Sequence, residues 1–152
     1  MSNSERELNK YLWLNCKKLT DKVFSTDNLP LSQLSPIALA YIGDAVYELY
    51  IRSQFLIPPK RIADYHTQVV TQVKAETQAI HLQHLESYLT SEEKDILRRG
   101  RNAVTHKPKR LSIKVYQQAS SLETLIGYLY LTDCDRLNYL LTKLNIAADS
   151  DG

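Results

Sequence analysis

The sequence predicts an all-α protein that forms a single domain. Strand signals are scarce, because the body of the chain has no Asn-Gly or Asp-Gly turn and little strict alternation of polar and apolar residues. Only four glycines occur among 152 residues, whereas long stretches carry apolar residues at helical spacing. At 43% hydrophobic content the chain can bury a core without disulfide or metal staples. We therefore expect one helical bundle spanning residues 1–152.

The first expected helix is amphipathic and covers about residues 4–19, and residues 20–34 read as a connection. Ser35 and Pro36 are typical of an N-cap followed by a first-turn proline, so the next helix begins there. This helix should reach about Phe55, before two consecutive prolines end it.

Residues 60–88 predict one long helix or two abutting ones. Thr90 and Glu93 then have the spacing of a capping box, which indicates a short helix over about residues 91–99. The following basic segment is expected to be broken by Gly100 and Pro108.

The last two helices are expected over residues 112–131 and 135–145. The folded core should therefore cover about residues 34–145, between a short polar N-terminus and a disordered acidic tail.

Two carboxylates interrupt otherwise apolar helices. Asp44 is the only charged residue in 37–47, a run that is apolar on every side of a helix and therefore predicts a buried one. Glu123 is likewise the only charged residue in 115–132. Burying even a neutral polar group without a partner costs on the order of 2–7 kcal/mol, so these acids require a partner, a proton or a metal. Two such acids indicate one shared site.

The glycines support this interpretation. Gly43 and Gly127 lie inside strong helical patterns, where glycine costs about 1 kcal/mol relative to alanine. Gly43 adjoins Asp44 and Gly127 lies one turn after Glu123, so a close crossing of the two helices would bring the carboxylates together. The alternative is that each acid pairs separately with its own Lys, Arg or Tyr.

Positive charge is concentrated in residues 98–110, which hold six of the 19 Lys and Arg residues and no acid. The rest of the chain has 13 basic against 17 acidic residues, so the net charge of +2 hides a basic patch. Such a patch favours contact with a polyanion, although a solvated loop without a ligand is the alternative. The expected phosphate contacts are Arg98, Arg99, Arg101, Asn102, Lys107 and Lys109.

Other candidate ligands are weaker. His81 and His84 are three residues apart on a helix, but no third ligand is evident, so ordinary surface or half-buried histidines are favoured. Glu48 lies four residues after Asp44 and faces the same way. It is either an accessory metal or water ligand or, as we favour, a partner of Arg52.

The chain has no sign of export or membrane insertion. Cys16 and Cys134 form no CxxC or Cys/His array, which favours a reducing compartment. The polar N-terminus precedes no signal-peptide core, and no stretch of 18 apolar residues occurs. We expect a cytoplasmic protein.

Three segments carry a family resemblance. Tyr41-Ile42-Gly43-Asp44-Ala45-Val46 resembles the signature of the ribonuclease III catalytic domain, and residues 122–131 resemble that family's second acidic motif. The Arg-Arg-Gly-Arg-Asn-Ala segment at 98–103 is similar to one in the Mini-ribonuclease III subfamily, a lone catalytic domain without a double-stranded RNA-binding domain. The resemblance covers about residues 34–145.

The resemblance implies an all-helical homodimer that cleaves double-stranded RNA with Mg²⁺ in ribosomal RNA maturation, leaving 5′-phosphate and 3′-hydroxyl ends. Asp44 and Glu123 carry over as catalytic acids and metal ligands. The apolar helix and its tyrosines place the dimer contact largely in residues 37–50.

The chain departs from the wider family at three acidic positions, where it has Ile37, Ala40 and Ser120. The depleted acid set leaves open the number of ions per subunit. It also leaves two other functions open, a non-catalytic RNA-binding or ribosome-associated module and, more weakly, a helical protein whose basic loop binds an acidic partner.

Overall fold

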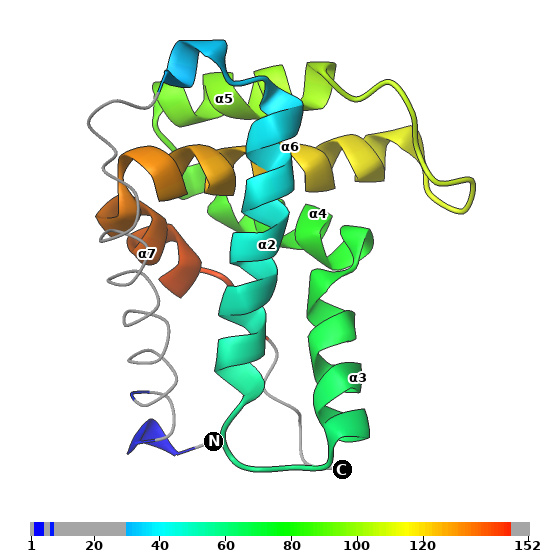
Figure 1. Cartoon of the computed structure of the whole chain (residues 1–152), viewed down its shortest axis with the longest axis vertical. Coiled ribbons are helices and arrows are strands. Elements are labelled where there is room, and N and C mark those ends of the chain that lie inside the picture. The colour runs from blue at the N-terminus through cyan, green and yellow to red at the C-terminus, as the bar shows by residue number, and fades with distance from the viewer. Residues whose placement is uncertain (1, 5–6, 8–29, 147–152) are drawn as a thin grey trace.

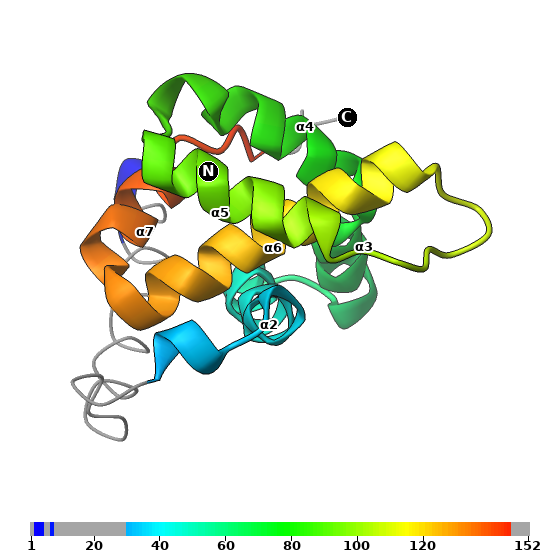
Figure 2. The same cartoon turned by 90° about the horizontal axis from the view of Figure 1, so that it is seen from above.

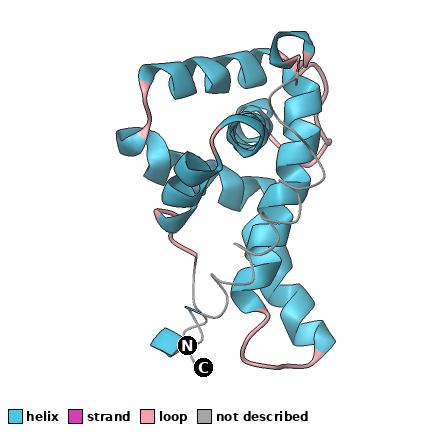
Figure 3. Ribbon diagram, turned by 60° about the vertical axis from the view of Figure 1, so that its left-hand side comes forward, coloured by secondary structure: helices cyan, strands magenta, loops and turns pink. Residues whose placement is uncertain are grey.

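The computed structural model describes residues 2–4, 7 and 30–146, and within them only helices, turns and loops occur (Figure 3). This confirms the predicted all-α class. The helix expected over residues 4–19 and the acidic tail fall almost entirely outside the described residues. The elements in order are the 3-10 turn η2 Leu31–Gln33, α2 Pro36–Phe55, α3 Ile62–Val73, α4 Ala75–Leu85, the 3-10 turn η3 Glu86–Tyr88, α5 Ser91–Asn102, α6 Ile113–Thr132 and α7 Cys134–Thr142.

Helix α6 is the centre of the bundle and packs against α2, α4, α5 and α7. α2 crosses α6 steeply, while α5 runs beside α6 (Figures 1 and 2). The segment between α5 and α6 projects away from the other helices in both views. The core under these helices includes the fully buried side chains of Tyr47, Ile51, Leu122, Leu125 and Leu137.

The predicted starts of the two longest helices are confirmed. The Ser35 side chain accepts a hydrogen bond from the backbone N–H of Ala38 at 3.1 Å, and Pro36 occupies the first turn of α2. Ser112 caps α6 in the same way, accepting from Val115 at 3.2 Å. Each cap satisfies a backbone donor that the first helical turn leaves free.

Residues 60–88 form two abutting helices rather than one. The backbone of Lys74 is extended, with ψ of 151°, so α3 ends at Val73 and α4 begins at Ala75. The carbonyl groups at the end of α3 therefore lack intrahelical donors. The side chain of Gln78 donates a hydrogen bond to one of them, the carbonyl of Val73, at 2.9 Å.

The predicted capping box of α5 is present. The Glu93 N–H donates to the Thr90 hydroxyl at 3.2 Å, and the Thr90 N–H donates to the Glu93 carboxylate at 2.9 Å. Arg136 donates to the same carboxylate, with its Nε at 2.6 Å, and so ties α7 to α5.

The expected break at Gly100 is wrong, because α5 continues to Asn102. Gly100 is buried against α6, where an added Cβ would lie 2.5 Å from the hydroxyl oxygen of Thr124. The missing side chain therefore serves close helix packing rather than helix termination.

The close crossing predicted at Gly43 and Gly127 is confirmed. A Cβ on Gly43 would lie 1.8 Å from the carbonyl oxygen of Glu123, and one on Gly127 would lie 1.9 Å from that of Leu39. Each glycine thus lets its helix touch the backbone of the other.

The expectation that α2 is buried on every side is corrected for the single chain. Ile37 is 64% exposed, Tyr41 85% and Leu49 41%, and Ala45 is exposed between them. These four residues recur every fourth position and form one stripe, which we call the α2 stripe. None of the described helices combines the length and the apolar character needed to cross a membrane.

Candidate active site

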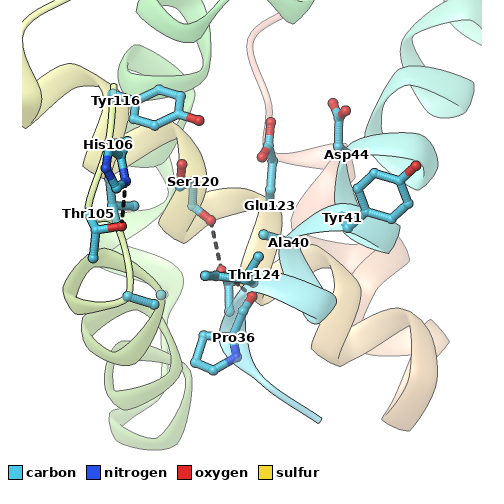
Figure 4. A pocket seen from close by; sticks show the side chains of 14 residues that line it. Pro36, Ala40, Tyr41, Asp44, Thr105, His106, Tyr116, Ser120, Glu123 and Thr124 are labelled. Atoms are coloured by element: carbon cyan, nitrogen blue, oxygen red, sulfur yellow. Dashed lines mark hydrogen bonds between the residues drawn. The ribbon is translucent and has the colours of Figure 1, made fainter. Parts of the chain in front are cut away.

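A pocket of about 290 Å³ opens between α2, α6 and the segment that follows α5. Asp44 from α2 and Glu123 from α6 both line it, and their carboxylates point the same way in Figure 4. The pocket is lined by Pro36, Ile37, Ala40, Tyr41, Asp44, Gly100, Ala103, Val104, Thr105, His106, Tyr116, Ser120, Glu123 and Thr124.

The two acids share one electrostatic environment. Burial and the negative charge of Asp44 raise the pKa of Glu123 to about 7, and a hydrogen bond from Gln78 opposes this shift. Asp44 is exposed in the single chain rather than buried as the sequence predicts, and Glu123 is partly buried. Partial burial and the nearby Glu48 still raise the pKa of Asp44. In the described part of the chain no Lys or Arg forms an ion pair with Asp44 or Glu123, so the alternative of separate basic partners is not observed.

This arrangement fits a magnesium ion. Mg²⁺ prefers oxygen ligands and keeps several waters, so two carboxylates suffice when water and substrate phosphate complete the coordination. The protein would supply only these two ligands, because the described residues contain no group of three or more His, Cys, Asp and Glu side chains that could hold a metal together. Ile37, Ala40 and Ser120 line the pocket and add no carboxylate.

Glu48 has the role that the sequence favoured. Arg52 donates hydrogen bonds to one Glu48 oxygen, from Nε at 3.1 Å and also from a terminal nitrogen. Glu48 is not among the residues that line the pocket.

The basic segment borders the pocket through its uncharged residues and His106, and neither Asn102 nor any of its six cations lines the pocket. Arg98 bonds to Asp95, with its Nε at 3.2 Å, and Arg110 bonds to Glu76 at 3.3 Å. The other four cations make no ion pair with any described residue. These free cations are Arg99 and Arg101 on the last turn of α5, and Lys107 and Lys109 in the projecting loop.

Asn102 ends α5 and is exposed, so it adds an amide beside these cations. Sequence reasoning gave no role to His106, Tyr116 or Thr105, which line the pocket on the side away from Asp44 (Figure 4). The only sequence signal for His106 was its place within the basic run.

Sequence reasoning also missed Gln78. Its Nε2 lies 3.1 Å from Oε1 of Glu123, and the side chain is buried. The available signal was a polar residue on an apolar stripe, because Gln78 shares its helix face with Leu82 and Leu85.

His81 and His84 do not form a metal site. His81 is 1% exposed rather than half-buried, and its Nδ1 lies 2.6 Å from the Tyr47 hydroxyl. Burial lowers the pKa of His81 to about 4, so the ring is neutral and packs in the core. His84 is exposed.

Comparison with known proteins identifies the family of the domain. The ribonuclease III domain model matches residues 37–133, a range that contains both acids, the basic segment and the two glycine contacts of the α2–α6 crossing.

Several similar proteins are named Mini-ribonuclease 3. The one from Synechocystis sp. is 53% identical over 116 residues, covering 76% of this chain and 81% of that protein. The one from Staphylococcus aureus is 40% identical over 116 residues, covering 73% of this chain and 87% of its own. A crystal structure of a Fusobacterium nucleatum protein is 28% identical, with a TM-score of 0.68, and covers 72% of this chain and 92% of that one.

The chain therefore belongs to the ribonuclease III family, and within it to the Mini-ribonuclease 3 group. It is a ribonuclease III-type endoribonuclease.

Proposed function

We propose that this endoribonuclease is metal-dependent and cleaves double-stranded RNA, leaving 5′-phosphate and 3′-hydroxyl ends. One observation carries the proposal: two carboxylates without basic partners share a pocket that the basic segment borders. A pair of unneutralised acids repels an RNA phosphate unless a cation lies between them. The same pair would hold such a cation.

Asp44 and Glu123 would hold the magnesium ion. When bound, Mg²⁺ activates a water molecule and withdraws charge from the phosphate. The chain itself fixes the two carboxylates relative to each other through the crossing of α2 and α6. The pocket leaves space beside them for the scissile phosphate.

The free cations would hold the RNA backbone. These cations, Arg99, Arg101, Lys107 and Lys109, are exposed. On α5, Arg98 and Asn102 lie on the same turn as Arg99 and Arg101. A-form RNA is recognised mainly through its shape, its phosphates and its 2′-hydroxyl groups, which a basic helix end and loop can contact without reading sequence.

A second copy of the chain would cover the α2 stripe. Exposed apolar residues at a four-residue repeat mark an interaction surface, and this stripe lies beside Asp44. A two-fold dimer through residues 37–50 would place one site on each strand of a duplex.

The resemblance to Mini-ribonuclease III adds finer expectations. We infer one catalytic domain over residues 1–152, a ribosomal RNA precursor as the substrate and a cytoplasmic setting.

The test is to incubate the purified protein with a duplex RNA in Mg²⁺ or in EDTA. Cleavage in Mg²⁺ alone, with 5′-phosphate and 3′-hydroxyl products, supports the proposal. Binding without cleavage in either condition would indicate the non-catalytic RNA-binding module instead. If the protein neither binds nor cleaves the RNA, the result would indicate that the basic segment binds an acidic protein partner.

A further inference from the structure

Gln78 is a buried amide that contacts one of the two site acids, Glu123. The side chain belongs to α4 and is 3% exposed. Its Nε2 donates one hydrogen bond to Glu123 Oε1 at 3.1 Å and another to the Val73 carbonyl at 2.9 Å.

The break between α3 and α4 fixes the orientation of this amide. Because the chain is extended at Lys74, the Val73 carbonyl lies at a helix end, where it accepts no intrahelical bond. Two acceptors, this carbonyl and the Glu123 carboxylate, therefore face the same amide nitrogen. A flipped amide would place an oxygen against both of them, so the network determines which end points at Glu123.

The amide also has an unfavourable side, its carbonyl oxygen. The Oε1 atom of Gln78 is buried and has no hydrogen-bond partner among the described residues. Met or Leu would fill the space without a buried carbonyl group, and Leu82 and Leu85 do so on the same face of α4. What Gln78 adds is an amide nitrogen that donates both to the Val73 carbonyl at the end of α3 and to Glu123.

A neutral donor can hold the Glu123 carboxylate without cancelling its charge. A Lys or Arg in contact with Glu123 would cancel the charge that attracts a cation. An amide restricts the carboxylate through one oxygen and leaves its charge in place. The second oxygen of Glu123 has no hydrogen bond to any described residue.

We propose that Gln78 is a positioning residue, which holds the Glu123 carboxylate through Oε1 so that its other oxygen is presented to the metal ion. This inference rests on the proposed role of Asp44 and Glu123 as metal ligands. With only two carboxylates in the pocket, the orientation of each has a large effect on metal affinity.

The test measures Mn²⁺ binding by calorimetry, without RNA. Gln78→Met keeps the size of the side chain and removes the donor, and should raise the Mn²⁺ dissociation constant by about 10- to 100-fold. The matched control is Gln72→Met, because Gln72 is equally buried and makes no hydrogen bond to Glu123. It should leave the dissociation constant within about twofold.

A kinetic readout separates positioning from general damage. Gln78→Met should raise the Mg²⁺ concentration for half-maximal cleavage, leave the KM for duplex RNA unchanged and recover most of the rate at saturating Mg²⁺. Circular dichroism and thermal unfolding check the fold. If this variant does not fold, Gln78→Asn replaces it, since it retains a buried amide that is one methylene group too short to span both acceptors.

Asp44→Asn distinguishes an error in the proposed metal site from an error in the proposed role of Gln78. If Asp44→Asn binds Mn²⁺ as tightly as the wild-type protein, the metal site itself is wrong. If Asp44→Asn loses binding while folded Gln78→Met or Gln78→Asn retains the wild-type dissociation constant, only the role of Gln78 is overturned. Equal losses in Gln72→Met and Gln78→Met would also overturn it.

Discussion

Gly43 of α2 lies directly on the backbone of Glu123 in α6, where an added Cβ would come within 1.8 Å of the Glu123 carbonyl oxygen. Asp44 is the next residue along α2. The contact that brings the two helices together therefore also sets the relative positions of the two acids.

Gly43→Ala should lower the free energy of unfolding by about 1–3 kcal/mol, because a backbone atom cannot move aside as a side chain can. The same displacement should weaken Mn²⁺ binding. Gly100→Ala is the comparison, since its Cβ would meet the Thr124 side chain, and it should be the milder change. Chemical unfolding measures both, and a Gly43→Ala protein as stable as the wild type would show that the helices do not touch here.

Asp44→Asn and Glu123→Gln should each reduce cleavage of duplex RNA by about a thousandfold or more, since metal-assisted stabilisation amounts to several kcal/mol. RNA affinity should change only a few fold. Glu92→Gln, at an exposed acid of the first turn of α5, is the control and should retain full activity. Full activity in either site variant would remove that acid from the proposed site.

The stability of the metal-free protein should depend on pH through Glu123. The pKa of this group is about 7 in the folded protein against 4.5 for the free side chain, so the folded state binds more protons between these values. Its contribution to stability is therefore complete below about pH 4.5 and is lost as the pH rises to about 7.

The measurement is thermal unfolding in EDTA at about pH 5 and pH 8, for the wild type and for Glu123→Gln. The wild type should lose stability relative to the variant at the higher pH. Because groups remote from Glu123 titrate alike in both proteins, the difference between them reports Glu123 together with its coupling to Asp44. Two parallel pH curves would mean that Glu123 does not have a raised pKa.

Metal binding should show the opposite trend. A proton and a cation compete for the Glu123 carboxylate, so Mn²⁺ affinity should increase between about pH 6 and pH 8. Calorimetric titration at three pH values checks this, and an affinity that is flat across the range would contradict it.

Replacing both Arg99 and Arg101 with Ala should flatten the slope of log affinity against log salt by about 1–2 units, since each phosphate contact contributes roughly 0.7–0.9. Binding should weaken for all RNA sequences alike, while Mn²⁺ binding stays unchanged. Arg61→Ala is the control, because Arg61 pairs with Asp64 on α3. Unchanged affinity and salt dependence in the double variant would mean that the RNA lies elsewhere.

Tyr41→Glu should convert the proposed dimer to a monomer at micromolar concentration, because it places a charge in the middle of the α2 stripe. Ile80→Glu is the control, since Ile80 is 51% exposed on α4 and lies outside the stripe. Light scattering distinguishes the species. A monomeric wild-type protein would disprove the dimer.

The sequence by itself determined the all-α class and the starts of α2, α5 and α6. Ser35, Ser112 and the Thr90–Glu93 box act within three residues of a helix end, so their effect does not depend on the rest of the chain. It also pointed to the shared pocket, because an isolated acid beside a glycine inside an apolar helix is anomalous in any fold.

Only the tertiary structure decided which faces are covered. Gly100 looked like a helix end and proved to be a packing contact with Thr124, and α2 looked buried throughout but exposes a stripe. Gln78 meets Glu123 across 45 residues of sequence, and Arg110 meets Glu76 across 34. Such contacts follow from how separate helices pack, and hydrophobic periodicity specifies that a helix has an apolar face without specifying its neighbour.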